Sequence, residues 1–120
     1  MAAIRTLGFS HVNVEVTDME RALAFYRLLG LQEIERAGSP ARAGAWFRFP
    51  QGHELHLAVG PAHAPSRAHF AIYVEDLAKA RSLLEAVGAA IESEREIPGI
   101  SRFFTRDPDG NRIEIVQRLR

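Results

Sequence analysis

The 120-residue sequence contains no cysteine, has no excess of charge of either sign and has no long apolar run. Without cysteine the chain cannot form a disulfide, a thiolate nucleophile or a cysteine-ligated zinc site. Fifteen basic and fifteen acidic side chains cancel, which argues against a general electrostatic attraction to nucleic acid or to an anionic membrane. No apolar run approaches the ~20 residues that a membrane span requires.

The rest of the composition is that of one globular domain. Apolar residues make up 47% of the chain and charged residues 25%, which is ordinary for a folded protein. The length suits a single domain over residues 1–120. Residues 1–9 lack the apolar core and the small-residue cleavage pattern of a signal peptide. We therefore expect a cytoplasmic protein whose partners include neither nucleic acid nor membrane.

The sequence repeats itself at an offset of 58 residues. Nine identities fall within residues 11–59, where composition alone predicts roughly four. Apolar residues also align with apolar residues, as Trp46 does with Phe104. The repeat therefore predicts two copies of one supersecondary unit rather than a chance likeness of two amphipathic segments. The identical pairs are His11 and His69, Val16 and Val74, Asp18 and Asp76, Ala22 and Ala80, Gly30 and Gly88, Pro40 and Pro98, Arg48 and Arg106, Pro50 and Pro108, and Gly52 and Gly110.

Each copy has the pattern of a strand, a helix and three further strands. Residues 9–16 alternate between valine on one face and polar residues on the other, which is typical of a strand. Thr17 and Glu20 have the spacing of a capping box, which predicts a helix that ends near Gly30. The other strands are expected at about residues 31–37, 44–49, 53–59, 68–74, 90–97, 101–106 and 111–118, and the second helix at 76–87.

The predicted fold class is α+β, with two βαβββ modules in one chain, at residues 7–59 and 68–118. One helix covers only one face of a four-stranded sheet, so the other face needs a partner. That partner is either the other module of the same chain or a module of a second chain. We expect the paired modules to form a curved sheet around a cleft, which is a common place for a ligand site.

The repeat also relates four side chains that could ligate a metal. His11 aligns with His69, and His56 aligns with Glu114. Each lies in an alternating strand, so its side chain points away from the face of its apolar neighbours. Modules that face each other would bring three imidazoles and one carboxylate to one centre, a set that suits a divalent ion of Zn, Ni, Fe, Co or Mn. A solvated strand face can also carry histidine, but the repeat relates all four positions and so favours the metal.

Three segments resemble the vicinal oxygen chelate superfamily, which includes glyoxalase I, bleomycin-resistance proteins and extradiol dioxygenases. HVNVEVTDMERALAFYRLLGL is similar to the opening strand and helix of that superfamily, RAHFAIYVEDLAKA to its fifth strand and second helix, and FFTRDPDGNRIEIVQ to its last two strands. The resemblance covers about Leu7 to Gln117. It implies a glyoxalase-like fold of paired βαβββ modules, usually in homodimers with the sites between modules.

The resemblance also implies metal ligands on the first, fourth, fifth and eighth strands. The matching residues are His11, His56, His69 and Glu114. The fourth-strand ligand of glyoxalase I is usually Glu or Gln, whereas this chain has His56, with Glu54 two residues earlier on the same face. The fourth-strand ligand is therefore either His56 or Glu54. Glu114 and His56 are the candidate catalytic residues, the latter as a ligand or as a nearby acid–base group.

The resemblance supports two functions from different classes. The first is a divalent-metal-dependent enzyme of isomerase, lyase or dioxygenase type, in which a small oxygenated substrate chelates the metal and the metal stabilises developing negative charge. The alternative is a non-catalytic resistance protein of the same fold that binds a drug or another small molecule. Such proteins usually lack the metal ligands and tend to be acidic. We therefore expect the enzyme, as a homodimer with a small-molecule substrate.

Overall fold

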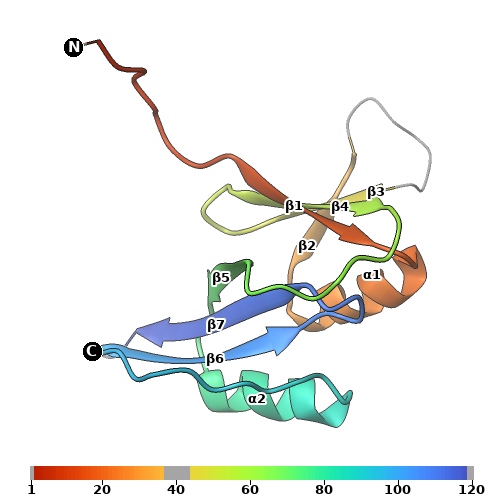
Figure 1. The fold of residues 1–120 in the computed structure, drawn as a ribbon, viewed down its shortest axis with the longest axis vertical. Coiled ribbons are helices and arrows are strands. Elements are labelled where there is room, and N and C mark those ends of the chain that lie inside the picture. The colour runs from red at the N-terminus through yellow and green to blue at the C-terminus, as the bar shows by residue number, and fades with distance from the viewer. Residues whose placement is uncertain (1, 37–43, 119–120) are drawn as a thin grey trace.

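The computed structural model describes residues 2–36 and 44–118; the remaining residues, among them Pro40, lie outside the described part. In Figure 1 the first sheet lies above the second, α1 lies at the right, α2 lies below the second sheet and the N-terminal segment extends away from both sheets. The elements of the described residues are β1 (His11–Val16), α1 (Met19–Leu28), β2 (Gln32–Ile34), β3 (Gly44–Arg48), β4 (Glu54–Val59), β5 (His69–Tyr73), α2 (Leu77–Ala86), β6 (Ile100–Arg106) and β7 (Arg112–Arg118).

The two sheets repeat one topology. The first sheet has the strand order β1-β4-β3-β2 and the second has the order β5-β7-β6. In each sheet the opening strand runs parallel to the last strand, which is antiparallel to the strand before it. His56 lies opposite Trp46, and Glu114 lies opposite Phe104, as the 58-residue offset requires. The α+β class and the two repeated modules are thereby confirmed.

Both helices begin after an aspartate at the same position of the repeat. Asp18 accepts a hydrogen bond from the backbone N–H of Arg21 at 3.1 Å, and Asp76 accepts one from that of Lys79 at 3.0 Å. The capping box predicted from Thr17 is therefore wrong, because Thr17 donates its hydroxyl to Asp109 at 2.6 Å instead. Among the described residues no helix is long and apolar enough to cross a membrane.

The strand expected over residues 90–97 is wrong. Glu92 exchanges both backbone hydrogen bonds with Phe104 at 2.8 Å, but the pairing does not extend into a strand. Pro98 has no N–H to donate, and Gly99 has a φ of 80°, so the chain turns here. The first module forms its strand β2 at the equivalent place, so the second sheet has one strand fewer.

The two modules share one hydrophobic core. It joins Tyr26 of α1 and Phe47 of the first sheet to Phe103 and Ile115 of the second. A polar contact connects the modules inside the core, because the buried hydroxyl of Tyr26 donates to Asp107 Oδ2 at 2.7 Å. Asp107 lies in the turn between β6 and β7, so this turn ties the second sheet to α1.

Candidate metal centre

The first half-site, His11 and His56, lies on the polar face of the first sheet. The two residues come from the parallel neighbours β1 and β4. Leu55 and Leu57, on either side of His56, are 0% and 2% exposed, so the alternation of the strand turns the imidazole to the opposite face. The His11 and His56 rings stack with their centroids 4.1 Å apart and an interplanar angle of 21°.

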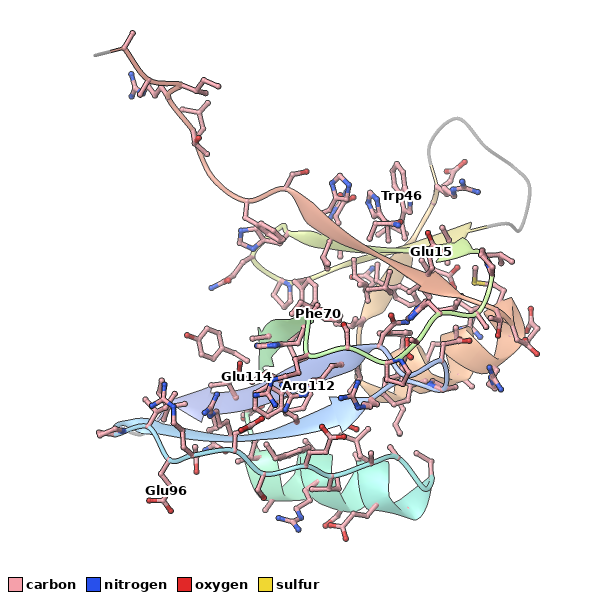
Figure 2. All side chains as sticks on the ribbon, in the orientation of Figure 1. Glu15, Trp46, Phe70, Glu96, Arg112 and Glu114 are labelled. Carbon is pink, nitrogen blue, oxygen red and sulfur yellow. The ribbon has the colours of Figure 1, made fainter. Side chains whose placement is uncertain are left out.

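Trp46 fixes the plane of the His56 ring. Their ring centroids lie 4.1 Å apart with an interplanar angle of 5°. Because β4 lies between β1 and β3, His56 is stacked between His11 and the indole. Figure 2 shows Trp46 on the side of the first sheet that faces away from the second sheet. The first half-site is therefore held rigidly on an outer face of the molecule.

Each imidazole of this pair has one ring nitrogen held by a neighbour. His11 Nδ1 lies 2.9 Å from the hydroxyl oxygen of Ser10, and His56 Nε2 lies 2.9 Å from Glu54 Oε1. Glu54 also accepts a hydrogen bond from Arg48 at 3.0 Å. The hydrogen bonds from His56 and Arg48 lower the pKa of Glu54. An ionised carboxylate only accepts hydrogen bonds, so His56 donates from Nε2 and keeps its lone pair on Nδ1.

The second half-site, His69 and Glu114, lies on the neighbouring strands β5 and β7 of the second sheet. His69 Nδ1 lies 3.0 Å from the backbone carbonyl oxygen of Arg67, and its Nε2 lies 3.2 Å from Glu114 Oε1. Both neighbours are acceptors, whereas a neutral imidazole has one N–H. When Nδ1 donates to the carbonyl, the Nε2 lone pair faces a carboxylate oxygen. Two acceptors at this distance repel each other unless a cation, either a proton or a metal ion, lies with them.

Ion pairs and an aromatic ring surround the second half-site. The ring of Phe104 lies edge-on to His69 with the centroids 5.1 Å apart, and the Arg112 guanidinium lies 3.7 Å from the Phe104 centroid. Arg112 also pairs with Glu94 at 2.8 Å, and this hydrogen bond lowers the pKa of Glu94. The pKa of Glu92 is lowered in the same way, mainly by its hydrogen bond from Arg106. These ion pairs involve Glu92 and Glu94 rather than Glu114, whose carboxylate contacts His69 and Arg102.

The two half-sites are not joined within one chain. His11 and His56 belong to the first sheet, whereas His69 and Glu114 belong to the second. Figure 2 shows Glu114 beside Arg112 on the second sheet, well below Trp46. In residues 2–36 and 44–118 no group of three or more His, Cys, Asp or Glu side chains is arranged to hold a metal ion. The convergence expected from the sequence is therefore not achieved by the single chain.

The donor chemistry of the half-sites fits a divalent metal. Metal-bound histidines almost always donate their second ring N–H to a carboxylate, a carbonyl or water. His56 has Glu54 in this role and His69 has the carbonyl of Arg67. The remaining lone pairs, together with the carboxylate of Glu114, are the nitrogen and oxygen donors that Zn, Mn, Fe, Co and Ni accept.

Two partners of these residues were missed by the sequence argument. Arg102 donates to Glu114 Oε2 at 3.2 Å, and Trp46 stacks on His56. The alternation of β6 places Arg102 on the face of Phe104, and Trp46 aligns with Phe104 in the repeat. The sequence pattern thus showed on which strand face Arg102 and Trp46 lie. The contact of Arg102 with Glu114, however, depends on the pairing of β6 with β7.

The chain matches known proteins over almost its whole length. Residues 8–115 match the sequence model of the Glyoxalase/Bleomycin resistance protein/Dioxygenase superfamily. Among solved structures it is similar to a glyoxalase family protein from Bacillus anthracis, with 30% identity, a TM-score of 0.82 and coverage of 98% of this chain and 99% of that one. A glyoxalase/dioxygenase from Nostoc punctiforme has 24% identity and a TM-score of 0.77, with 99% and 100% coverage.

The fold is also that of a fosfomycin resistance protein. The E126Q mutant of FosX from Listeria monocytogenes has 21% identity and a TM-score of 0.77, with coverage of 92% of this chain and 90% of that one. A comparison with curated proteins finds no match. The superfamily match spans both modules and both half-sites, so the chain belongs to the Glyoxalase/Bleomycin resistance protein/Dioxygenase superfamily.

Proposed function

We propose that the chain is a divalent-metal-dependent enzyme that acts on a small oxygenated substrate, and that each metal site combines two chains. In this proposal His11 and His56 of one protomer face His69 and Glu114 of a second copy. The FosX mutant was solved with Mn(II) and a dihydroxypropylphosphonic acid, which is a metal with an oxygen-rich small molecule on this fold.

The observation that carries the proposal is the contact between His69 Nε2 and Glu114 Oε1 at 3.2 Å. In the tautomer whose Nδ1–H donates to the backbone carbonyl of Arg67, the Nε2 lone pair faces the carboxylate oxygen, and a metal ion between the two atoms would satisfy both. Metal ligands must be deprotonated, so a metal ion would compete with the proton that otherwise joins these atoms. The first half-site has the same arrangement, because Glu54 takes the N–H of His56 and leaves one lone pair.

A second copy is the simplest source of the missing ligands. The first half-site lies on an outer face and the second lies on the other sheet, and within the described part of one chain no third ligand joins either pair. In a twofold dimer the contacts are reciprocal, and two equivalent sites form at once. The repeat supports this arrangement, since half-sites at equivalent positions of two modules can face each other across a twofold axis.

The bound metal would supply a positive charge that stabilises an oxyanion on the substrate. His56 then acts as an acid–base group or ligand whose ring plane is held by Trp46 and His11. Glu54 accepts a hydrogen bond from His56 Nε2 and so directs Nδ1 away from the carboxylate. Glu114 would supply the anionic ligand of the site and would partly neutralise the charge of the metal.

Subunit complementation tests the proposal. His11→Ala and Glu114→Gln each remove one ligand from a different half-site. We expect each homodimer to lose Mn²⁺, Zn²⁺ and Ni²⁺ binding in calorimetric titration. Coexpression of the two variants with different affinity tags and tandem purification yields the heterodimer. That heterodimer holds one intact site and one doubly altered site, so it should regain about half of the wild-type metal stoichiometry.

The controls separate the possible failures. His53→Ala removes an imidazole that lies outside both half-sites and should bind metal as the wild type does. Sites built within one chain would give no recovery in the heterodimer, which would contradict the arrangement between two chains. Wild-type protein that binds none of the three metals would contradict the enzyme and would favour the binding protein, which a thermal-shift screen with a cationic glycopeptide can detect.

A further inference from the structure

We propose that Arg102 is a positioning residue for Glu114: it holds Oε2 of the carboxylate and thereby leaves Oε1 to face the metal. This inference rests on the proposed metal site. Arg102 lies on β6 and Glu114 on β7, and the antiparallel pairing of these strands brings their side chains to one face.

The two oxygens of Glu114 have different partners. Oε1 lies 3.2 Å from His69 Nε2, and Oε2 lies 3.2 Å from Arg102 Nη1. Arg102 Nη2 donates to the backbone carbonyl of Arg95 at 2.9 Å, which anchors the guanidinium independently of Glu114. One oxygen is thus directed to the metal-binding imidazole and the other to a fixed cation. Such a division favours a carboxylate that binds the metal through one oxygen.

Arg102 is poorly explained as a stabilising residue. The side chains of Arg102 and Glu114 are only 14% and 15% exposed, and an ion pair taken so far out of water gains little net stability. The Nε–H of Arg102 is buried and has no hydrogen-bond partner among the described residues. An unsatisfied buried donor costs stability, so its presence calls for another reason. Holding a metal ligand is such a reason.

The first module lacks this feature at the equivalent position. Arg102 aligns with Gly44, where a Cβ would lie 2.8 Å from the backbone oxygen of Leu57. An arginine side chain at this position would clash with β4, and the equivalent of Glu114 in that module is His56. At this strand position the module that supplies the anionic ligand therefore has an arginine, whereas the module that supplies an imidazole has a glycine, against which the Arg36 guanidinium lies.

Arg102→Met tests the proposal, with Arg106→Met as the matched control. Arg106 lies on the same strand and face and also pairs with a carboxylate, Glu92, at 3.0 Å. We expect Arg102→Met to weaken Mn²⁺ and Co²⁺ binding about 10–100-fold, the usual effect of removing a partner of a metal ligand. Arg102→Met also leaves the Glu114 carboxylate without its cation, so the melting temperature of the metal-free protein should fall, and the affinities are compared at a temperature where both variants are folded. Arg106→Met should bind metal within about twofold of the wild type.

Two further measurements distinguish positioning from general support. Arg102→Lys keeps the charge and should recover part of the lost affinity. The visible absorption of the Co²⁺ form should weaken in Arg102→Met, because a released carboxylate can bind through both oxygens and raise the coordination number. Unchanged affinity and spectrum in Arg102→Met would overturn the role of Arg102 while Glu114→Gln still abolishes binding. Metal binding that survives Glu114→Gln would instead overturn the proposed site itself.

Discussion

The two modules share an order of elements but differ in what their equivalent positions do. In the first module the turn between β3 and β4 has the sequence FPQGH, and in the second the turn between β6 and β7 has the sequence DPDGN. Both have proline second and glycine fourth, which suits a tight turn. Only the second turn carries carboxylates, and these bind α1 of the first module. The repeat thus conserves the turn geometry while one copy has become the link between modules.

The half-sites differ in a similar way. Each contains a histidine, a glutamate and an arginine in contact, but from different positions of the repeat. In the first module Arg48 holds Glu54, and Glu54 holds His56. In the second module the glutamate itself occupies the ligand position, and its arginine comes from a strand position that is glycine in the first. The two modules therefore bring the same three residue types into contact through different positions of one repeated backbone.

The largest effect is expected for the link between modules. Asp107 is 4% exposed and accepts hydrogen bonds from Tyr26, from Asn111 and from the backbone of Asp109. Asp107→Ala leaves several buried donors unpaired, so we expect a loss of about 3 kcal/mol in the free energy of unfolding. Gln51→Ala, in the equivalent turn of the first module, should change it by less than about 0.5 kcal/mol. Urea unfolding measures the free energy of unfolding of both variants. Equal losses would contradict the view that only the second turn links the modules.

A smaller effect is expected when only the hydroxyl of Tyr26 is removed. Tyr26→Phe loses one buried hydrogen bond and should cost about 1–2 kcal/mol at neutral pH. Burial, and next the charge of Asp107, raise the pKa of Tyr26 well above its ordinary value. Its contribution is therefore complete below the unfolded pKa of about 10 and is lost as the pH rises through the folded value.

Alkaline unfolding isolates that contribution. The wild type should lose stability above about pH 10, and Tyr26→Phe should lose less over the same range. Tyr73→Phe, which changes a tyrosine on the exposed side of β5, should keep the wild-type decline. A decline that is identical in wild type and Tyr26→Phe would show that this tyrosine does not govern the alkaline limit.

The smallest effect is expected for the outer end of the first half-site. Arg48 is 52% exposed on its side chain, so Arg48→Gln should lower the melting temperature by no more than about 2 °C. The pKa of Glu54 is lowered by His56 and by Arg48, so its contribution is present above the unfolded pKa and is lost as the pH falls through the folded value. Arg48→Gln should therefore reduce the loss of melting temperature that occurs on acidification. Melting curves recorded between pH 6 and about pH 3 measure this loss.

The sequence predicted the fold better than it predicted contacts between distant residues. Alternating valines located β1, and the offset of 58 residues located the second module from the first. Local patterns are less reliable, since the spacing of Thr17 and Glu20 predicts a capping box, whereas Thr17 donates to Asp109, which is 92 residues away. Residues 90–97 have a pattern that predicts a strand, but their pairing with β6 is limited to isolated bridges before Pro98.

The candidate ligands could be placed on strands and faces from alternation alone. Their metal-binding role stays a prediction, because it depends on how two sheets, or two chains, come together. Periodicity carries no information on that step. Arg102 illustrates the limit: its face was readable from the alternation of β6, but its contact with Glu114 depends on the register of two antiparallel strands.

The chain has a single tryptophan, and it is the residue stacked on His56. All indole fluorescence of the protein therefore originates from a ring in direct stacking contact with the first half-site. Emission from an indole is sensitive to a protonated imidazole or a paramagnetic ion in contact with it. The protein thus contains its own optical probe, which reports on the first half-site in every protomer without any label.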